Sequence, residues 1–349
     1  MKFGNYITQK RHRSIRCLFF LISYFYNMFP KFDLSKFENK RILIVGDIML
    51  DEFIHTTSNR NSPEYKDVPI LKIKEKRQYL GGAANVALNI KKLKAIPYLI
   101  GIVGEDVAAQ TIYELLHQAK ITNQYIYGST RQKTTVKSRV FLNKKPIFRI
   151  DAEEKIIHEE LVNHFILKQI SDAIKNQKPH VIILQDYNKG VLNAATISDI
   201  IALAKQHNIS ICVDPKHENW DLFKDVDLFK PNEKELLKIS EKLLVNENNI
   251  ENIAQELQKK INFKYLLVTL GSKGNFTFDG QKSEILHQKS EIQNADVCGA
   301  GDTVIAVASL GLACGFSLNE IAEISNKAGF IVCQKENIQP ITFDELERK

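Results

Sequence analysis

The sequence of 349 residues contains few cysteines and lacks the motifs of several common protein classes. Its five cysteines are odd in number, and no two are spaced as Cys-x-x-Cys. This usage argues against a disulfide framework and a zinc site, and it indicates reduced thiols in a cytoplasmic protein. No Gly-x-x-x-x-Gly-Lys-Ser/Thr sequence is present, which excludes a P-loop nucleotide site. Internal repeats and low-complexity linkers are also missing, so we expect one domain rather than two.

Most of the chain has no excess charge of either sign. The formal net charge is +7, but residues 1–41 hold nine basic and two acidic side chains and account for all of it. The 39 basic and 39 acidic side chains of the remaining sequence cancel. A nucleic-acid-binding domain carries a basic patch, so the composition argues against a nucleic-acid partner.

The first segment lacks a run long enough to cross a membrane. Basic residues precede an apolar run at 17–29, the order found in a signal peptide. The run is shorter than the about 20 residues that a spanning helix needs, so we expect no stable membrane insertion. No small-residue cleavage site follows it; the alternatives are translation from Met28, a membrane-surface anchor and export. We expect residues 1–38 to be an extension, untranslated or disordered, and residues 39–349 to form the folded domain.

Short apolar runs alternate with amphipathic segments through the rest of the chain. Strands are predicted at 41–46, 98–103, 181–184, 209–213, 226–229 and 265–269, and helices at 84–93, 108–118, 160–174, 196–207 and 250–261. This alternation predicts an α/β fold with a mostly parallel sheet covered on both faces. Two further segments, 53–74 and 134–150, are predicted as antiparallel hairpins. They could form a small β lid over the carboxyl ends of the sheet, where open α/β folds bind ligands.

A turn with two glycines leads into an apolar helix near the carboxyl terminus, with the sequence GAGD at 299–302. Glycines let backbone N–H groups approach a ligand closely, and the first turn of a helix favours an anion. A carboxylate beside such an anion site is well placed to take a proton from an attacking hydroxyl. The pattern indicates phosphoryl transfer to an alcohol with Asp302 as the base. The alternative is a glycine turn with Asp302 as an ordinary helix N-cap. A dinucleotide fingerprint is disfavoured because its third glycine is missing.

Further glycines and polar residues lie at the ends of successive predicted strands, where a parallel sheet collects ligand groups. Asp47 and Asp51 could accept hydrogen bonds from a polyol, although aspartate is also common in turns at strand ends. Paired glycines before Asn85 allow close backbone approach, or simply a tight turn into a helix. The residues predicted for the sugar side are Asp47, Asp51, Gly81, Gly82, Asn85 and Asp186.

A second group of strand ends suggests a nucleotide site. Asn232 and Glu235 lie three residues apart at the start of a helix, which is the pattern of a capping box. The functional alternative places Glu235 near a phosphate-bound Mg²⁺ through water. The glycine turn after the strand at 265–269 suits nucleotide phosphates. The residues assigned to the nucleotide are Asn232, Glu235, Thr269, Gly271, Lys273, Gly274 and Asn326.

From about residue 40 onward, these motifs resemble those of the ribokinase-like (PfkB) carbohydrate kinases. The resemblance rests on the motifs GGAAN at 81–85 and DVCGAGD at 296–302, which occur in this order and about 200 residues apart. Within the family, VGDIMLD at 45–51, RNSPE at 60–64, DYNKG at 186–190 and DPK at 214–216 are most similar to kinases of D-glycero-β-D-manno-heptose 7-phosphate. Some relatives carry an additional adenylyltransferase domain, so we expect any nucleotidyl step to need another protein. The usual Gly-Thr of the family is missing at 333–340.

The resemblance implies a three-layer sandwich with a mostly parallel central sheet, a small β lid and a homodimer formed through that lid. It also implies ATP- and Mg²⁺-dependent phosphorylation of the anomeric hydroxyl of the heptose 7-phosphate, giving the 1,7-bisphosphate for ADP-heptose and lipopolysaccharide core. The backbone of Gly299, Ala300 and Gly301 would stabilise the transferring phosphoryl group. The cations expected to hold the phosphate of the sugar are Arg139, Arg149 and Lys189. The alternatives are a kinase of another sugar, sugar phosphate or nucleoside, and a non-catalytic sensor.

Overall fold

The computed structural model describes residues 32–154, 160–245, 249–288 and 296–348. Chain contacts divide the protein into the units Met1–Asp33 and Leu34–Lys349, and the second unit holds every helix and strand described below. Among the described residues, no helix combines the length and the apolar character needed to cross a membrane.

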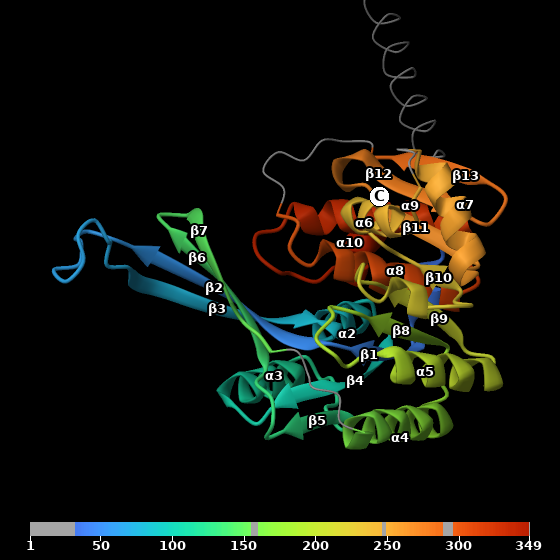
Figure 1. The fold of residues 1–349 in the computed structure, drawn as a ribbon, viewed down its shortest axis with the longest axis horizontal. Coiled ribbons are helices and arrows are strands. Elements are labelled where there is room, and N and C mark those ends of the chain that lie inside the picture. Colours follow the sequence, from blue (N-terminus) through green and yellow to red (C-terminus); the bar gives the residue numbers. More distant parts are fainter. Residues whose placement is uncertain (1–31, 155–159, 246–248, 289–295, 349) are drawn as a thin grey trace, which may run out of the picture. The chain divides into compact units, whose positions relative to one another are not determined.

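The larger of two sheets has nine strands in the order β13-β12-β11-β10-β9-β8-β1-β4-β5 (Figure 1). Seven neighbouring strands pair in parallel: β11, β10, β9, β8, β1, β4 and β5. Next to β11, strands β12 and β13 extend the sheet in antiparallel orientation. Their bounds are β1 Arg41–Gly46, β4 Ile96–Gly104, β5 Ile126–Ser129, β8 Val181–Gln185, β9 Ser210–Asp214, β10 Leu228–Phe229, β11 Tyr265–Thr269, β12 Gly274–Phe278 and β13 Ser283–His287. The predicted α/β class and mostly parallel sheet are therefore confirmed.

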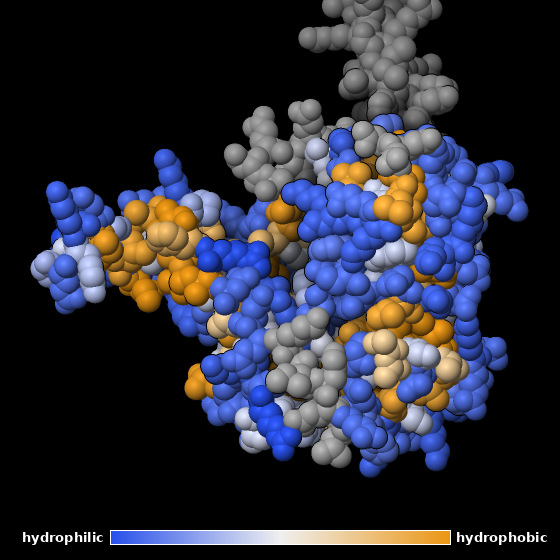
Figure 2. All heavy atoms as spheres, viewed as in Figure 1, coloured by the Kyte–Doolittle hydropathy of each residue, from blue (hydrophilic) through white to orange (hydrophobic). Residues whose placement is uncertain are grey.

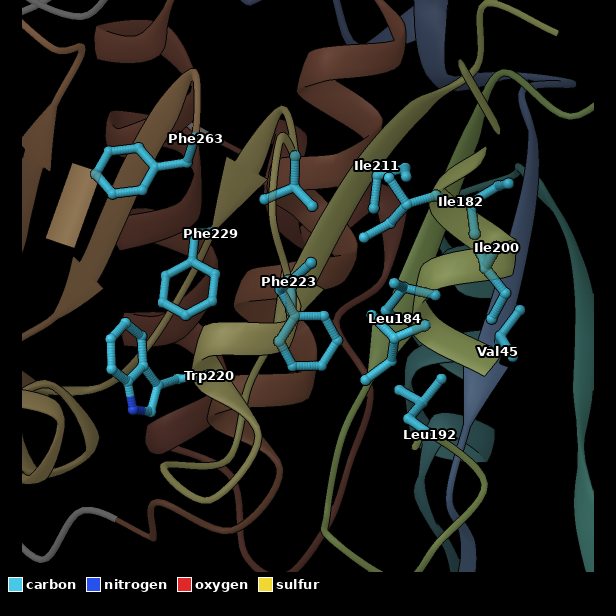
Figure 3. Packing of buried hydrophobic residues seen from close by; sticks show 14 of the residues in the cluster. Val45, Ile182, Leu184, Leu192, Ile200, Ile211, Trp220, Phe223, Phe229 and Phe263 are labelled. Carbon is cyan, nitrogen blue, oxygen red and sulfur yellow. The ribbon is translucent and has the colours of Figure 1, made fainter. Parts of the chain in front are cut away.

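Helices cover both faces of this sheet because its central strands are apolar along nearly their whole length, as in a buried parallel sheet. One face packs against α4 to α7, and Figure 3 shows part of the resulting core around Val45, Leu184 and Phe229. The other face packs against α2, α8 and α9. The helices are α2 Ala83–Lys92, α3 Val107–Gln118, α4 Glu160–Gln177, α5 Ala194–Gln206, α6 Glu233–Lys242, α7 Ile250–Ile261, α8 Ala300–Ala313, α9 Leu318–Cys333 and α10 Phe343–Glu347, with 3₁₀ turns η1 Leu34–Phe37, η2 Trp220–Leu222 and η3 Gly271–Lys273.

The two hairpins expected from the sequence form a separate four-stranded sheet, called the lid below, in the order β3-β2-β6-β7 (Figure 1). The hairpins β2–β3 and β6–β7 are antiparallel, whereas β2 and β6 pair in parallel. The strands are β2 Ile48–Thr57, β3 Lys72–Gly82, β6 Thr135–Leu142 and β7 Lys145–Ala152. The first hairpin extends well beyond the predicted 53–74. Asp51 consequently lies inside a lid strand, and the prediction that it ends the first core strand is wrong.

Candidate active site

Asp302 is the third residue of α8 and is 4% exposed. Its Oδ2 accepts a hydrogen bond from Asn85 Nδ2 at 2.8 Å. Its Oδ1 accepts two, from Tyr187 Oη at 2.9 Å and from Gln185 Nε2 at 3.1 Å. The helix N-cap is Gly299 and receives no side-chain hydrogen bond, so Asp302 does not cap its own helix. The N-cap alternative is therefore wrong, because all three partners come from α2 and the end of β8.

The surroundings of Asp302 favour a proton acceptor that works near neutral pH. Burial, with a further contribution from the neighbouring Asp214, raises the pKa of Asp302 to about 7, although hydrogen bonds from Asn85 and Tyr187 oppose the increase. The Tyr187 hydroxyl stays protonated, because burial and the nearby Asp302 raise its pKa well above 10. A carboxyl group whose pKa lies close to the working pH is suited to accept a proton from a substrate hydroxyl.

The N-terminal turn of α8 contains the glycines for which the sequence predicts an anion site. Gly299 has a φ of 76°, and a Cβ there would lie 2.8 Å from Asn85 Nδ2, so glycine is required. The Ala300 N–H donates to Val297 O at 3.3 Å, whereas within the described chain the N–H groups of Gly299 and Gly301 have no recorded acceptor. A Cβ on Gly301 would lie 3.9 Å from Lys230 Nζ. Two amides and one ammonium group therefore lie close to the start of this helix.

Asp47, one of the three aspartates predicted to bind the sugar, accepts hydrogen bonds from the backbone of the loop that follows β8. Asp47 Oδ2 accepts from the backbone N–H groups of Tyr187 (2.8 Å) and Lys189 (3.1 Å), and its Oδ1 accepts from Val191 at 3.3 Å. Asp47 is buried, and burial raises its pKa. These contacts fix the loop that follows β8 and thereby the position of Tyr187.

Asp186 has a similar environment at the start of the same loop. It accepts hydrogen bonds from the backbone of Asn188 (2.7 Å) and Lys216 (3.3 Å) and from Asn219 Nδ2 (3.1 Å). Burial, with a further contribution from Asp47, raises the pKa of Asp186 to about 7. Its oxygens connect the loops after β8 and β9, so Asp186 supports the site wall.

Asp51 faces the site from the lid. Its Oδ1 accepts from Arg139 Nη1 at 2.6 Å. A Cβ on Gly81 would overlap Asp51 Oδ2, and one on Gly82, where φ is 57°, would overlap the carbonyl oxygen of Asp47. The two glycines therefore let β3 run directly past the carboxylates before α2 begins.

The three cations predicted to bind the phosphate of the sugar each have a carboxylate partner. Arg139 pairs with Asp51 as described, and Lys189 pairs with Glu153 at 2.7 Å. Arg149 lies on the exposed strand β7 and contacts Asp151 at 2.8 and 2.9 Å. Arg139 and Arg149 are direct neighbours across the β6–β7 pair.

On the nucleotide side, the capping-box interpretation of Asn232 and Glu235 is confirmed: each side chain accepts from the backbone N–H of the other. Glu235 also binds Lys216 through its Oε1. The buried Lys230 pairs with Asp214 at 3.0 Å, and Gln185 Nε2 connects Asp214 to Asp302.

The remaining residues predicted to bind the nucleotide lie at the C-terminal end of β11, in the turn that follows it, and on α9. Thr269 ends β11 and forms an isolated bridge with Asn232. Gly271 (φ 61°) begins η3, and a Cβ there would meet open space. Gly274 (φ 105°) begins β12, and Lys273 is exposed and pairs with Glu233 at 2.9 Å. Asn326 lies on α9 and donates to Leu286 O at 3.4 Å, beside β13.

Four residues of the site were not singled out by the sequence. Gln185 and Tyr187 bind Asp302, Lys230 lies near Gly301, and Lys137 lies near the ring of Tyr187. Gln185 ends β8, Tyr187 lies in the loop that follows, and Lys230 comes directly after β10. The rule that ligands gather at the carboxyl ends of parallel strands would have found these three. Lys137 lies on the lid, where that rule does not apply.

A family model described as "pfkB family carbohydrate kinase" matches residues 39–344, which include every element of the site. The chain belongs to the pfkB family of carbohydrate kinases. It is therefore a carbohydrate kinase, as the sequence motifs predicted, and family membership supports ATP as the phosphoryl donor.

Curated relatives agree with this assignment, and solved structures share the fold. The chain is 33% identical to the bifunctional protein HldE of Methylobacillus flagellatus over 311 residues, and 34% identical to that of Helicobacter pylori strain J99 over 310 residues. These matches cover 88% of the chain but only 62% and 65% of the relatives. The fold is similar to Arabidopsis thaliana ribokinase complexed with ribose and ATP (TM-score 0.66, 20% identity) and to Escherichia coli phosphofructokinase-2 with substrates and products (0.70, 18%); each match covers 88% of this chain and 97% of the other.

Proposed function

We propose that this pfkB-family kinase transfers the γ-phosphoryl group of ATP to the anomeric hydroxyl of D-glycero-D-manno-heptose 7-phosphate, for ADP-heptose and lipopolysaccharide core synthesis. The proposed phosphoryl transfer rests on one observation: the buried Asp302 in the first turn of α8 has a pKa of about 7. The motifs at 45–51, 60–64 and 186–190, together with similarity to the bifunctional HldE proteins, support the choice of sugar.

Asp302 acts as the base in this proposal. As the hydroxyl oxygen of the sugar attacks the γ-phosphorus, its proton passes to a carboxylate oxygen of Asp302. The bond between the γ-phosphorus and the β–γ bridging oxygen breaks, and ADP leaves with that oxygen. Tyr187 and Gln185 both donate to Oδ1, so one of these contacts opens or is shared when the substrate hydroxyl approaches.

Hydrogen-bond donors at the start of α8 stabilise negative charge on the transferring phosphoryl group in this proposal. The N–H groups of Gly299 and Gly301 and the ammonium of Lys230 are the donors closest to the start of α8. Such fixed donors cost no reorganisation at the moment of transfer. Asn232, Thr269, Gly271, Lys273, Gly274 and Asn326 form the proposed path of the nucleotide.

The side chains present fit an ion held mainly by the triphosphate. No three His, Cys, Asp or Glu side chains cluster as a metal site among the residues with described positions. Mg²⁺ usually keeps several waters and binds substrate phosphates, and when bound it would neutralise charge on the β- and γ-phosphate oxygens. Glu235 would contact it through water, because Lys216 and the Asn232 N–H engage its oxygens.

A coupled assay of ADP release tests the proposal. The panel is heptose 7-phosphate, the unphosphorylated heptose, ribose, fructose and fructose 6-phosphate, each with ATP and Mg²⁺. We expect the highest kcat/KM with heptose 7-phosphate. A higher value with another sugar would replace the proposed substrate, and no ADP release with any acceptor would favour a sensor.

We also infer that two copies pair through their lids. Apolar side chains on the lid are exposed, with Ile73 and Phe148 at 60% and Ile150 at 57%, and Figure 2 shows hydrophobic residues gathered along this sheet. Exposed apolar patches of this kind mark interaction sites. A second copy presents the same patch, so a two-fold axis can cover both at once.

A further inference from the structure

Lys137 differs from every other cation around the candidate site. It lies on lid strand β6 and is 8% exposed, and its Nζ lies 4.8 Å from the centre of the Tyr187 ring. In the part of the chain that the structure describes, its ammonium group has no recorded hydrogen bond or ion pair. Burial lowers the pKa of Lys137, as expected of a charge removed from water.

The carboxylates close to Lys137 are already engaged. Its neighbours across the lid are Asp51 on β2 and Asp151 on β7. Asp51 binds Arg139 and Asp151 binds Arg149. Glu153, the remaining nearby carboxylate, binds Lys189. The cluster therefore carries one positive charge more than its carboxylates neutralise, and that charge belongs to Lys137.

A largely buried lysine side chain whose ammonium group lacks a carboxylate partner is stabilised when a ligand supplies a negative charge. Lys137 is directed at the ring of Tyr187, and the hydroxyl of that ring binds Asp302. The excess charge therefore lies one aromatic ring away from Asp302, the proposed base. Lys230, assigned to the donor phosphates, is paired with Asp214. Lys216, whose Nζ lies 5.0 Å from the centre of the same Tyr187 ring, is paired with Glu235.

We propose that Lys137 is the specificity-determining cation for the acceptor and binds the phosphate ester of a sugar phosphate. This proposal rests on the kinase activity proposed above and names the residue that distinguishes phosphorylated from neutral sugars. Arg139, Arg149 and Lys189 then act as a surrounding shell whose own carboxylates are already in place. Lys137 is the group that gains a partner when the substrate binds.

The test compares the Lys137→Met variant with wild type. Titration calorimetry without ATP should show the Kd of heptose 7-phosphate rising about 10- to 100-fold, the effect of losing one hydrogen bond to a charged group. In the assay, the ratio of kcat/KM for heptose 7-phosphate to that for the unphosphorylated heptose should fall by the same factor. This ratio is measured within one variant, so a reduced folded fraction does not alter it. Lys74→Met, an exposed lysine on β3 of the same lid, should leave both values unchanged.

Three results would overturn the proposal. In the first, Lys137→Met raises the KM for ATP and leaves the ratio unchanged, which assigns Lys137 to the donor. In the second, both sugars lose activity equally, which indicates a structural role. In the third, wild type phosphorylates neutral sugars only. If wild type instead prefers fructose 6-phosphate, the proposed heptose is wrong, and the same comparison with fructose 6-phosphate and fructose still decides the role of Lys137.

Discussion

At the scale of single residues, the chemistry depends on Asp302. Its carboxylate, near the start of α8, is oriented by Asn85, Gln185 and Tyr187. We expect Asp302→Asn to bind ATP and sugar with near-normal Kd and to turn over at least about 100-fold more slowly, because a positioned base contributes about 10²- to 10⁴-fold. Calorimetry and the ADP assay measure the two effects separately. A turnover close to that of wild type would remove Asp302 from this role.

The pH dependence follows from the same residue. Since only the ionised carboxylate accepts a proton, kcat/KM should rise with pH and reach half its plateau near the Asp302 pKa of about 7. The Tyr187 hydroxyl bond stabilises the ionised form, so Tyr187→Phe should move this acidic limb to higher pH. Both profiles are measured with the same sugar phosphate, so ionisation of the substrate affects them equally. A limb that stays in place or moves to lower pH would contradict the assignment.

At the scale of elements, Asn232 has two interpretations that one pair of variants can separate. It caps α6, and Ser317 forms an equivalent capping box on α9. We expect Asn232→Ala and Ser317→Ala each to lower the free energy of unfolding by about 1 kcal/mol, measured by urea denaturation. Only Asn232→Ala should raise the KM for ATP, by roughly 2- to 10-fold, if Asn232 also lies beside the nucleotide. Equal KM values for both variants would reduce Asn232 to its capping role.

The sequence predicted the positions of helices and strands better than it predicted which of them lie side by side. Apolar runs alternating with amphipathic segments located β1, β4, β8, β9 and β11 within two residues, because buried parallel strands have few polar positions. The same pattern could not assign Asp51 to the lid, since a strand that follows another after a single residue resembles a continuation of it. The glycines next to Asp302 in the sequence identified it as a candidate base. Its partners Gln185 and Tyr187 have no such motif beside them, so their contacts with Asp302 were not predicted.

At the scale of the whole molecule, the proposed pairing of two copies through their lids makes a testable prediction. If exposed Phe148 and Ile150 on β7 contact a second copy, a charge at either position should disrupt the contact by burying an unpaired carboxylate. We expect wild type to have the mass of a dimer by light scattering, and Phe148→Asp with Ile150→Asp to have that of a monomer. An exposed control, Leu244→Asp, lies outside the lid and should not change the mass. A monomeric wild type would contradict the inferred pairing.

The amino-acid sequence by itself determined the fold class, the family and the candidate base, because all three depend on local patterns: strand-length apolar runs, glycine turns and a carboxylate at a helix start. Tertiary structure decided which side chains surround that base. Strand β8 lies between β1 and β9 although it follows β1 by 135 residues, and this order brings Asp47, Gln185 and Asp214 to one edge beside α8. It also decided which charges are balanced. Within the described part of the lid, Lys137 lacks a carboxylate partner because the register of β2, β6 and β7 places an arginine beside each neighbouring aspartate.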